Sequence, residues 1–418
     1  MESTATGAWL LVSSSFVLLM TPALAFFYGG MSRVKAVLNM LMMCYAALAI
    51  VPIVHVFWGF NLAYGKDSFL GFFANPFSGQ DYLHTLDTPS SSGYPLIFDV
   101  IFQMTFAVIA CAIIAGSIAE RTRFTAWLLF IPAWVTLVYY PLAHMVWGGG
   151  LLSHSANSIS GFLFGHEGGH AHVAPIDFAG GTVVHISAGT AALVLALMVG
   201  PRRGFKKQVH RPHNLPMVML GTGLLWFGWC GFNAGSALSA GGLAALAWLN
   251  TAVAAAAGGI GWLAYERYRD GYATPLGLAS GLVAGLVAIT PAAGALTPTT
   301  SVILGFSAGL LSSSLVSLKY KLAFDDTLDV VAVHLAAGVW GTLAVGVLAS
   351  NRSWQLVCIQ TVVALAAMAF SGALTWAIAK AIDKTVGLRL DPETEHNGAD
   401  KIHGESAYDW GTSPFSRF

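Results

Sequence analysis

The chain has 418 residues, of which 56% are hydrophobic and only 10% are charged. With a mean hydropathy of +0.67, it lies outside the usual range of soluble globular domains and is predicted to be embedded in a bilayer. Its formal net charge is zero, which gives no electrostatic support for a nucleic-acid partner.

Apolar stretches recur along almost the whole chain, and about 20 apolar residues in a helix are enough to cross the hydrocarbon core of a membrane. The sequence predicts an all-α membrane protein with eleven transmembrane helices. Their expected bounds are 6–28, 37–64, 97–119, 124–146, 179–199, 215–237, 241–265, 274–291, 300–318, 329–349 and 355–382. The first stretch lacks a basic segment before it and is too long for a signal peptide, so it is interpreted as the first membrane helix.

The Lys and Arg residues are unevenly distributed between the two sides that these helices define. All of them except Lys66 and Arg352 fall on one side, which the positive-inside rule makes cytoplasmic. The N-terminus is therefore expected outside and, with an odd number of helices, the C-terminus inside. This segregation also supports the helix count, because one missed or extra helix would scramble it.

Weak sequence similarity between the two halves of the chain indicates an inverted repeat of helices one to five and six to ten, with helix eleven outside it. Such repeats are common in transporters. Helix five is expected to open with Asp177 and to carry His185, followed by Ile-Ser-Ala-Gly. Helix ten is expected to open with Asp329 and to carry His334, followed by Leu-Ala-Ala-Gly. Ordinary helix packing through small residues is the alternative explanation of such runs.

His185 and His334 are the clearest functional candidates, because an ionisable group inside a membrane helix is costly. A neutral imidazole can hold a mobile proton or exchange hydrogen bonds with a small solute. The alternative is that each histidine only bonds a neighbouring helix. Each lies about six residues into its predicted helix, roughly 9 Å from opposite faces of the membrane, so the two meet only if their helices start below the surface.

Aromatic residues near the helix ends form a second candidate site. They are Phe102, Phe106, Trp147, Trp229 and Phe232. Ring faces attract a small cation, and Ser236 would add a hydroxyl acceptor beside them. The alternatives are an aromatic belt at the membrane interface for the rings and simple packing for the serine.

Asp177 stands where helix five is predicted to start, so its carboxylate is expected to cap free backbone N–H groups, with direct attraction of a cation as the alternative. A further polar cluster has a metal-like composition but lies in a Gly-rich outer segment, and we interpret it as a flexible loop. Its members are His166, Glu167, His170 and His172.

The cysteines lie far apart, inside apolar spans, and are interpreted as small core residues. They are Cys44, Cys111, Cys230 and Cys358. An intramembrane enzyme would need metal-ligand spacing such as HExxH, or a nucleophile beside a base, and the sequence suggests neither. We therefore expect no catalytic residue, no metal and no cofactor.

Five short motifs become specific in combination. They are Asp-Phe-Ala-Gly-Gly-Thr-Val-Val-His ending at His185, His-Met-Val-Trp-Gly-Gly-Gly around Trp147, Gly-Phe-Asn-Ala-Gly-Ser around Phe232, Pro-His-Asn-Leu-Pro from Pro212, and His-Gly-Glu-Ser-Ala-Tyr from His403. Together they closely resemble the Amt branch of the Amt/Mep/Rh ammonium transporters, over essentially the whole chain. The resemblance implies a homotrimer of eleven-helix protomers, each with its own pore and an outer N-terminus.

The resemblance also implies roles for individual residues. The outer ammonium site would be Phe106, Trp147 and Ser236. The stacked gate would be Phe106 and Phe232. The pore would hold the twin histidines His185 and His334 together with Trp229. Asp177 matches a structural aspartate near the outer site, and one departure is Ala399, where the family pattern has Leu.

The expected function is transport of ammonium or ammonia across the plasma or bacterial inner membrane, with methylammonium as a further candidate substrate. A transmembrane domain is expected over 1–387 and a cytoplasmic regulatory tail over 388–418, which resembles the family segment that supports regulation by PII-type signal proteins. The main alternative is an ammonium sensor that signals through its tail, although no fused signalling domain is recognised. A gas channel of the Rh type is a further alternative, against which Trp147 and Ser236 argue.

Overall fold

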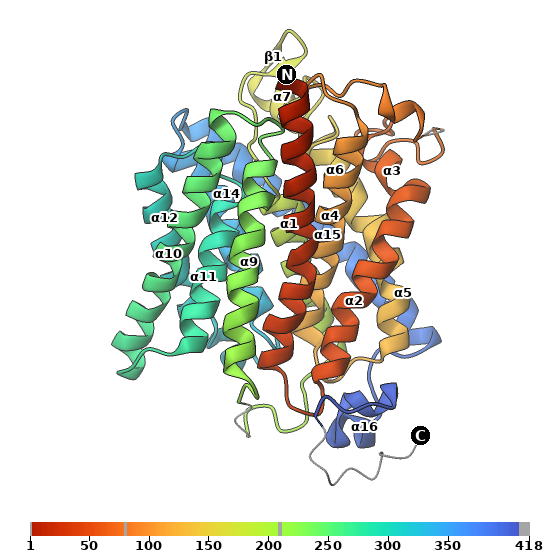
Figure 1. Ribbon diagram of the computed structural model, residues 1–418, viewed down its shortest axis with the longest axis vertical. Helices are drawn as coiled ribbons and strands as arrows, with labels where there is room; N and C mark the ends of the chain where they lie inside the picture. The colour runs from red at the N-terminus through yellow and green to blue at the C-terminus, as the bar shows by residue number, and fades with distance from the viewer. Residues whose placement is uncertain (1, 79–81, 208–210, 409–418) are drawn as a thin grey trace.

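The computed structural model describes residues 2–78, 82–207 and 211–408, and nearly all of its regular structure is helical. The long helices are α1 (Glu2–Met31), α2 (Val37–Val54), α4 (Ile97–Ile114), α9 (Leu215–Gly235), α10 (Gly242–Asp270), α12 (Pro298–Leu315) and α15 (Trp354–Thr385). They run side by side along one axis of a single bundle (Figure 1).

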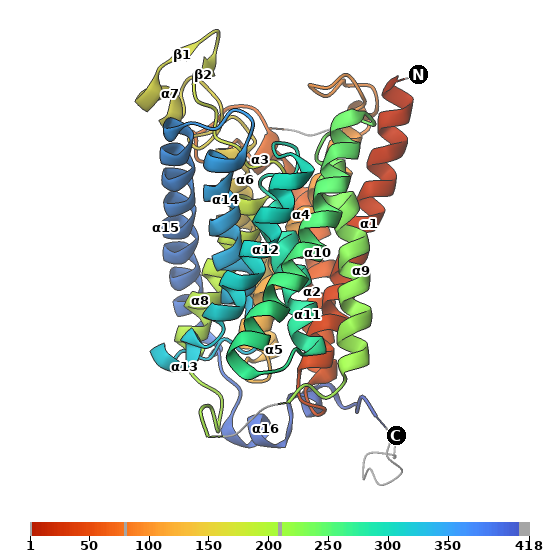
Figure 2. The same ribbon diagram turned by 90° about the vertical axis from the view of Figure 1, so that its left-hand side faces the viewer.

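Shorter helices complete the bundle and its ends. They are α3 (Phe60–Tyr64), α5 (Phe124–Trp134), α6 (Tyr140–Val146), α7 (Ile159–Phe164), α8 (Ser187–Val199), α11 (Pro275–Ile289), α13 (Leu318–Leu322), α14 (Ala337–Leu348) and α16 (Pro392–Asn397). Strands β1 (His166–Glu167) and β2 (His170–Ala171) pair antiparallel. Figure 2 shows this hairpin at the end of the bundle where α1 begins, and α16 at the opposite end.

Four of the described spans contain a wider, π-helical segment. The π-helical segments are η1 (His55–Gly59), η4 (Val135–Tyr139), η5 (Gly181–Ile186) and η6 (Val331–Ala336). The segment joins two α-helical pieces in η1 and η4 and begins the span in η5 and η6. The segments η2 (His84–Leu86), η3 (Ala115–Ile118) and η7 (Ala399–His403) are short 3₁₀ helices. Because η5 and η6 carry His185 and His334, both histidines lie where the helical winding is irregular, as is common at functional positions.

The predicted spans agree with the structure to within a few residues at most boundaries. Among the described residues, 10 helical segments are long and apolar enough to cross a membrane. The exception is the predicted span 274–291, where α11 has only 15 residues and is about 22 Å long. The helix packs against α9, α10, α12 and α14, inside the bundle. The chain is therefore a multi-pass membrane protein.

Close contact through glycine holds neighbouring helices together, as expected in a bilayer, where lipid is as apolar as the helices and association depends on packing. Between α12 and α10, a Cβ atom on Gly309 would lie 2.0 Å from the carbonyl oxygen of Gly258. One turn away, a Cβ atom on Gly305 would lie 2.1 Å from the carbonyl oxygen of Ala254. Any larger residue at these positions would push the two helices apart.

Part of the predicted tail packs against the end of the bundle. The Leu390 N–H donates to the carbonyl oxygen of Arg121 over 2.8 Å. The Asn39 N–H, at the start of α2, donates to Oδ1 of Asp400 over 2.8 Å. Residues 409–418 of the predicted tail lie outside the described residues.

Two buried acids at the same end of the bundle pair with one arginine. The guanidinium of Arg202 contacts Asp325 at 2.8 Å and Glu120 at 3.4 Å. Burial alone would raise the pKa of Asp325, but the hydrogen bonds from Arg202 and the positive charges of Arg202 and Arg121 together outweigh burial and hold that pKa below its ordinary value. The pair therefore stays ionised and links the loops on either side of it.

Candidate functional site

The helical segment that carries His185 begins inside the protein and is capped by Asp177. Oδ1 of Asp177 accepts the N–H of Gly180 at 3.1 Å, and Oδ2 accepts those of Thr182 at 3.0 Å and Val183 at 3.1 Å. Gly180 has a φ of 111°, a conformation that favours glycine. The carboxylate thus satisfies N–H groups that a helix start leaves without partners.

In the second half of the chain the helix begins directly after Asp329, as expected, but the carboxylate that takes the capping place of Asp177 is that of Asp326. Oδ2 of Asp326 accepts the Val331 N–H at 2.7 Å, at the start of η6. The carboxylate of Asp329 instead pairs with Lys319 at 2.5 Å. The sequence pairs Asp329 with Asp177 because each lies near the expected start of its helix. In fact Asp326 precedes His334 by eight residues, the same spacing that separates Asp177 from His185.

The two histidines meet in the interior. Their Nδ1 atoms are 3.2 Å apart, and the ring centroids are 5.3 Å apart with planes inclined by 27°. Both residues are at most 3% exposed. The sequence placed the two histidines near opposite faces of the membrane. They can meet because both helical segments begin among buried residues rather than at the surface of the bundle.

Aromatic rings lead to this pair from the end of the bundle where α4 begins, which is the end expected to face outside. Trp147 meets Phe106 edge-on at 6.1 Å, and Phe106 stacks on Phe232 with centroids 4.0 Å apart and planes inclined by 17°. The Phe232 ring lies 6.2 Å from that of His185. Trp229 stacks on His185 at 5.3 Å. The stacked phenylalanines thus separate the outer rings from the two imidazoles.

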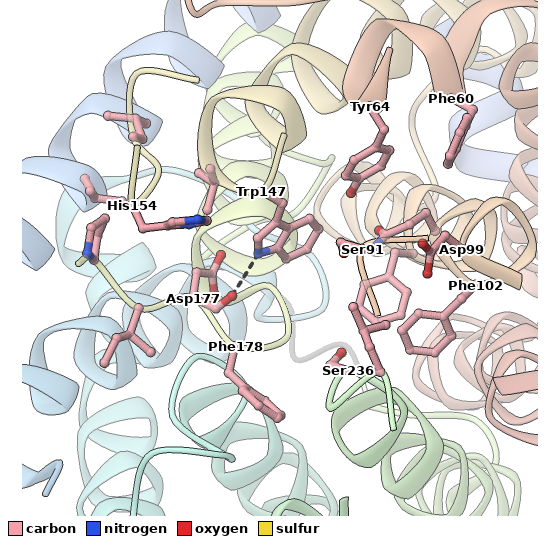
Figure 3. Close-up of a pocket in the computed structure, with 18 of the residues that line it drawn as sticks. Phe60, Tyr64, Ser91, Asp99, Phe102, Trp147, His154, Asp177, Phe178 and Ser236 are labelled. Atoms are coloured by element: carbon pink, nitrogen blue, oxygen red, sulfur yellow. Dashed lines mark hydrogen bonds between the residues drawn. The ribbon is translucent and has the colours of Figure 1, made fainter. Parts of the chain in front are cut away.

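An outer cavity of about 500 Å³ reaches the first of these rings. Its lining includes Phe106, Trp147, Asp177 and Ser236, from four separate segments of the chain, and Figure 3 shows three of them around the space. The indole N–H of Trp147 donates to the carbonyl oxygen of Asp177 at 2.8 Å, which fixes the ring. The Ser236 hydroxyl donates to the carbonyl oxygen of Phe232 at 2.9 Å, so its own oxygen can still accept.

The cavity and the surroundings of the histidine pair include polar residues that sequence reasoning missed. Asp99 and Gln103 lie in α4, and Tyr64 ends α3. Their signal was available, since Asp99, Gln103 and Phe106 follow the i, i+4, i+7 pattern of one helix face. Deeper in the bundle, Thr290 accepts the indole N–H of Trp229 at 2.9 Å, a contact between distant segments that no local pattern reveals.

The histidine-rich segment adjoins the cavity through His154, which lines it. His166 and His170 belong to the β1–β2 hairpin, so this part of the predicted loop has regular structure. The ring of His154 stacks on that of His170 at 5.2 Å, and His172 approaches Glu167 at 4.0 Å. In the described ranges, no three His, Cys, Asp or Glu side chains are grouped as metal ligands would be.

Comparison with known proteins agrees with this geometry. The model of the Ammonium Transporter Family matches residues 8–408. The chain is 44% identical to an ammonium transporter of Mycobacterium tuberculosis, over 97% of this chain and 90% of that one.

Two solved structures resemble the whole bundle. A protein described as a sensor Amt protein superposes with a TM-score of 0.86 at 29% identity, covering 97% of this chain and 99% of that one. Mep2 of Saccharomyces cerevisiae superposes with a TM-score of 0.82 at 31% identity, covering 93% and 88%. With a family match over nearly its full length and relatives named as transporters, the chain belongs to the ammonium transporter family.

Proposed function

We propose that this transporter binds the ammonium ion at Phe106, Trp147 and Ser236, removes its proton beside the stacked rings of Phe106 and Phe232, and passes neutral ammonia along His185 and His334. The observation that carries the proposal is the series of rings from the outer cavity to the paired imidazoles. Ring contacts run from Phe106 through Phe232 to His185, so a solute leaving the cavity would meet the phenylalanine rings before the histidines.

The hydrogen-bonding capacity of the imidazole pair suits ammonia. If one Nδ1 donates to the other, one ring keeps an acceptor at Nε2 and the other keeps a donor there. Nε2 of His185 is buried and has no hydrogen-bond partner among the described residues. A buried polar atom without a partner is costly, and ammonia, which both donates and accepts, would supply one.

Passage as the neutral species explains how potassium would be rejected. Potassium resembles ammonium in size and charge, but it cannot lose its charge. Burying a bare cation among the apolar pore residues would cost far more than moving one proton. If ammonium titrates like other amines, deprotonating it two to three units below its pKa costs roughly 3 to 4 kcal/mol. The outer rings and Ser236 would hold the cation while that proton leaves.

The transport function also suggests a finer architecture. We propose that α11, together with the buried turn after it, is the eighth of eleven membrane crossings, and that helices one to five and six to ten form an inverted repeat with α15 outside it. The equal spacing from Asp177 to His185 and from Asp326 to His334 supports the repeat. The distribution of Lys and Arg supports an outer N-terminus and an inner C-terminus.

Two further proposals concern assembly and regulation. Members of this family are expected to form homotrimers, and we propose the same for this chain. We further propose that residues 388–418 are a regulatory segment for a PII-type signal protein, separate from the transmembrane domain of residues 1–387. The contacts of Leu390 and Asp400 with the bundle support a route by which the tail reaches the helices.

The test of the proposed function is uptake of labelled methylammonium by proteoliposomes that contain the purified protein. Saturable uptake above that of protein-free vesicles, weakened by substitutions at Trp147 and Ser236, is the expected result. Uptake that matches protein-free vesicles would refute transport, and saturable uptake insensitive to both substitutions would refute the outer site.

A further inference from the structure

The outer cavity contains a second carboxylate opposite Asp177. Asp99 lies in the first turn of α4 and lines the cavity, and Figure 3 shows it beside Tyr64 and Ser91, across the space from Trp147 and Asp177. The two carboxylates differ in the number of hydrogen bonds that they accept. Asp177 accepts three backbone N–H groups, whereas the hydrogen bond recorded for Asp99 is the one from the Tyr94 hydroxyl, at 2.5 Å.

Asp99 therefore keeps capacity for a further partner. An ionised carboxylate offers about four acceptor positions. In the described part of the chain, no Lys, Arg or His forms an ion pair with Asp99. A partly buried carboxylate without a counter-ion is costly, and its cost falls when a cation binds beside it.

Two more oxygen atoms near Asp99 point to the same ligand. The Tyr64 hydroxyl and Oε1 of Gln103 are buried, and neither has a hydrogen-bond partner in the described ranges. Both residues line the cavity, as do the rings of Phe60 and Phe102. The Phe60 and Tyr64 rings are 5.3 Å apart. Orphan polar atoms of this kind in a native structure call for an absent partner, and aromatic faces favour a cationic one.

We infer that Asp99, Tyr64 and Gln103 form a second ammonium-binding site in the outer cavity, which collects the cation before it reaches Phe106, Trp147 and Ser236. Ammonium is a tetrahedral donor of four N–H groups, and this side of the cavity presents three acceptors with spare capacity. The inference rests on the proposed function, because the cation would pass from this second site to the site formed by Phe106, Trp147 and Ser236.

The helix geometry supplies the path between the two sites. Asp99, Gln103 and Phe106 share one face of α4, because residues four and seven positions apart lie above one another on a helix. Phe106 is seven residues beyond Asp99, or about 10 Å deeper along the helix axis. A cation released by Asp99 would therefore pass Gln103 and arrive at the stacked rings. Selection against potassium stays with the gate, since these oxygens would accept any small cation.

A purely structural role for Asp99 makes a different prediction. An acidic residue in the first helical turn complements the helix dipole, and the bond from Tyr94 ties the preceding loop to α4. If that were its whole role, Asp99→Asn would lower thermal stability and leave affinity unchanged. If Asp99 collects ammonium, the change would raise the half-saturation concentration and leave the maximal rate close to that of the unchanged protein.

The experiment measures methylammonium uptake by proteoliposomes at low and high ionic strength. Asp99→Asn is expected to raise the half-saturation concentration about three- to tenfold at low salt, a range set by the attraction of two charges a few ångströms apart in a partly solvated site. The difference should shrink at high salt, because screening weakens charge attraction. Asp99→Glu should restore most of the affinity. Asp87→Asn, which changes an exposed acid of the same connection, is the matched control and should have no effect.

Tyr64→Phe keeps the test decisive if Asp99→Asn does not fold, because it removes a hydroxyl that forms no bond within the described protein. It should raise the half-saturation concentration with the thermal stability intact. Unchanged affinity in Tyr64→Phe and Asp99→Asn, or an equal change in Asp87→Asn, would overturn the inference. Trp147→Leu, measured in parallel, separates the two sites. If only Trp147→Leu weakens uptake, the second site is refuted and the proposed outer site stands. If only Asp99→Asn weakens uptake, the proposed outer site is refuted.

Discussion

Trp147 provides the sharpest test of cation binding by aromatic rings, because its ring face and its N–H group have separable roles. The ring borders the outer cavity and meets Phe106 edge-on at 6.1 Å, while the N–H donates to the carbonyl oxygen of Asp177 at 2.8 Å. Trp147→Leu removes both interactions. Trp147→Phe keeps a smaller ring face and removes the hydrogen bond.

The expected size of the effect follows from the strength of a cation–π contact, about 0.5 to 2 kcal/mol according to how far the ion is desolvated. Since 1.4 kcal/mol is a tenfold change in affinity, Trp147→Leu should raise the half-saturation concentration for methylammonium roughly two- to thirtyfold. Trp147→Phe should lose less affinity. The lost hydrogen bond, worth about 0.5 to 1.5 kcal/mol, should appear in both variants as lower thermal stability.

Initial rates of labelled methylammonium uptake into proteoliposomes, together with thermal stability in detergent, separate these outcomes. Trp354→Leu is the control, because Trp354 is 76% exposed and does not line the cavity. A half-saturation concentration in Trp147→Leu equal to that of the unchanged protein would refute the binding role and leave Trp147 as an interfacial anchor.

Three further predictions concern the pore, the helix packing and the tail. The double variant His185→Asp/His334→Glu, still folded, should admit potassium or lose electrogenic ammonium transport, because a pore carboxylate stabilises an intact cation; potassium exclusion with normal currents would contradict the pore mechanism. Gly309→Ala should lower stability by about 1 to 3 kcal/mol in a detergent melt, because its Cβ atom would meet Gly258 at 2.0 Å, whereas Gly223→Ala, with no atom within 4 Å, should not. Truncation after Leu388 should change uptake or PII binding and leave the trimer assembled; unchanged transport and an unchanged response to nitrogen status would refute a regulatory tail.

The helices were predictable because the bilayer constrains their length and composition strongly. Ten of the predicted spans coincide with apolar helices of sufficient length, and the span 124–146 matches its helical segment at both ends. The length of α11 was harder to predict. The predicted span continued through Thr290 and Pro291, where the chain has already left the helix and forms a buried irregular turn.

The candidate site was predictable where residues are chemically unusual for a membrane. His185 and His334 stood out as ionisable groups in apolar spans, and the structure brings them to 3.2 Å. Asp326 was missed because Asp329 lies closer to the expected helix start. Only the hydrogen bond from the Val331 N–H, seen in the structure, identifies Asp326 as the capping residue. Contacts between distant segments, such as that of Trp229 with Thr290, depend on tertiary packing and leave no local signal in the sequence.

The most direct test of the account is to record electrical current and substrate flux together, on the reconstituted protein, first with ammonium and then with potassium. If ammonium sheds its proton at the gate and crosses as ammonia, labelled substrate should enter in the first condition, and potassium should carry no current above that of protein-free membranes in the second. Potassium current through the unchanged protein, at a rate comparable to ammonium transport, would contradict passage of a neutral species.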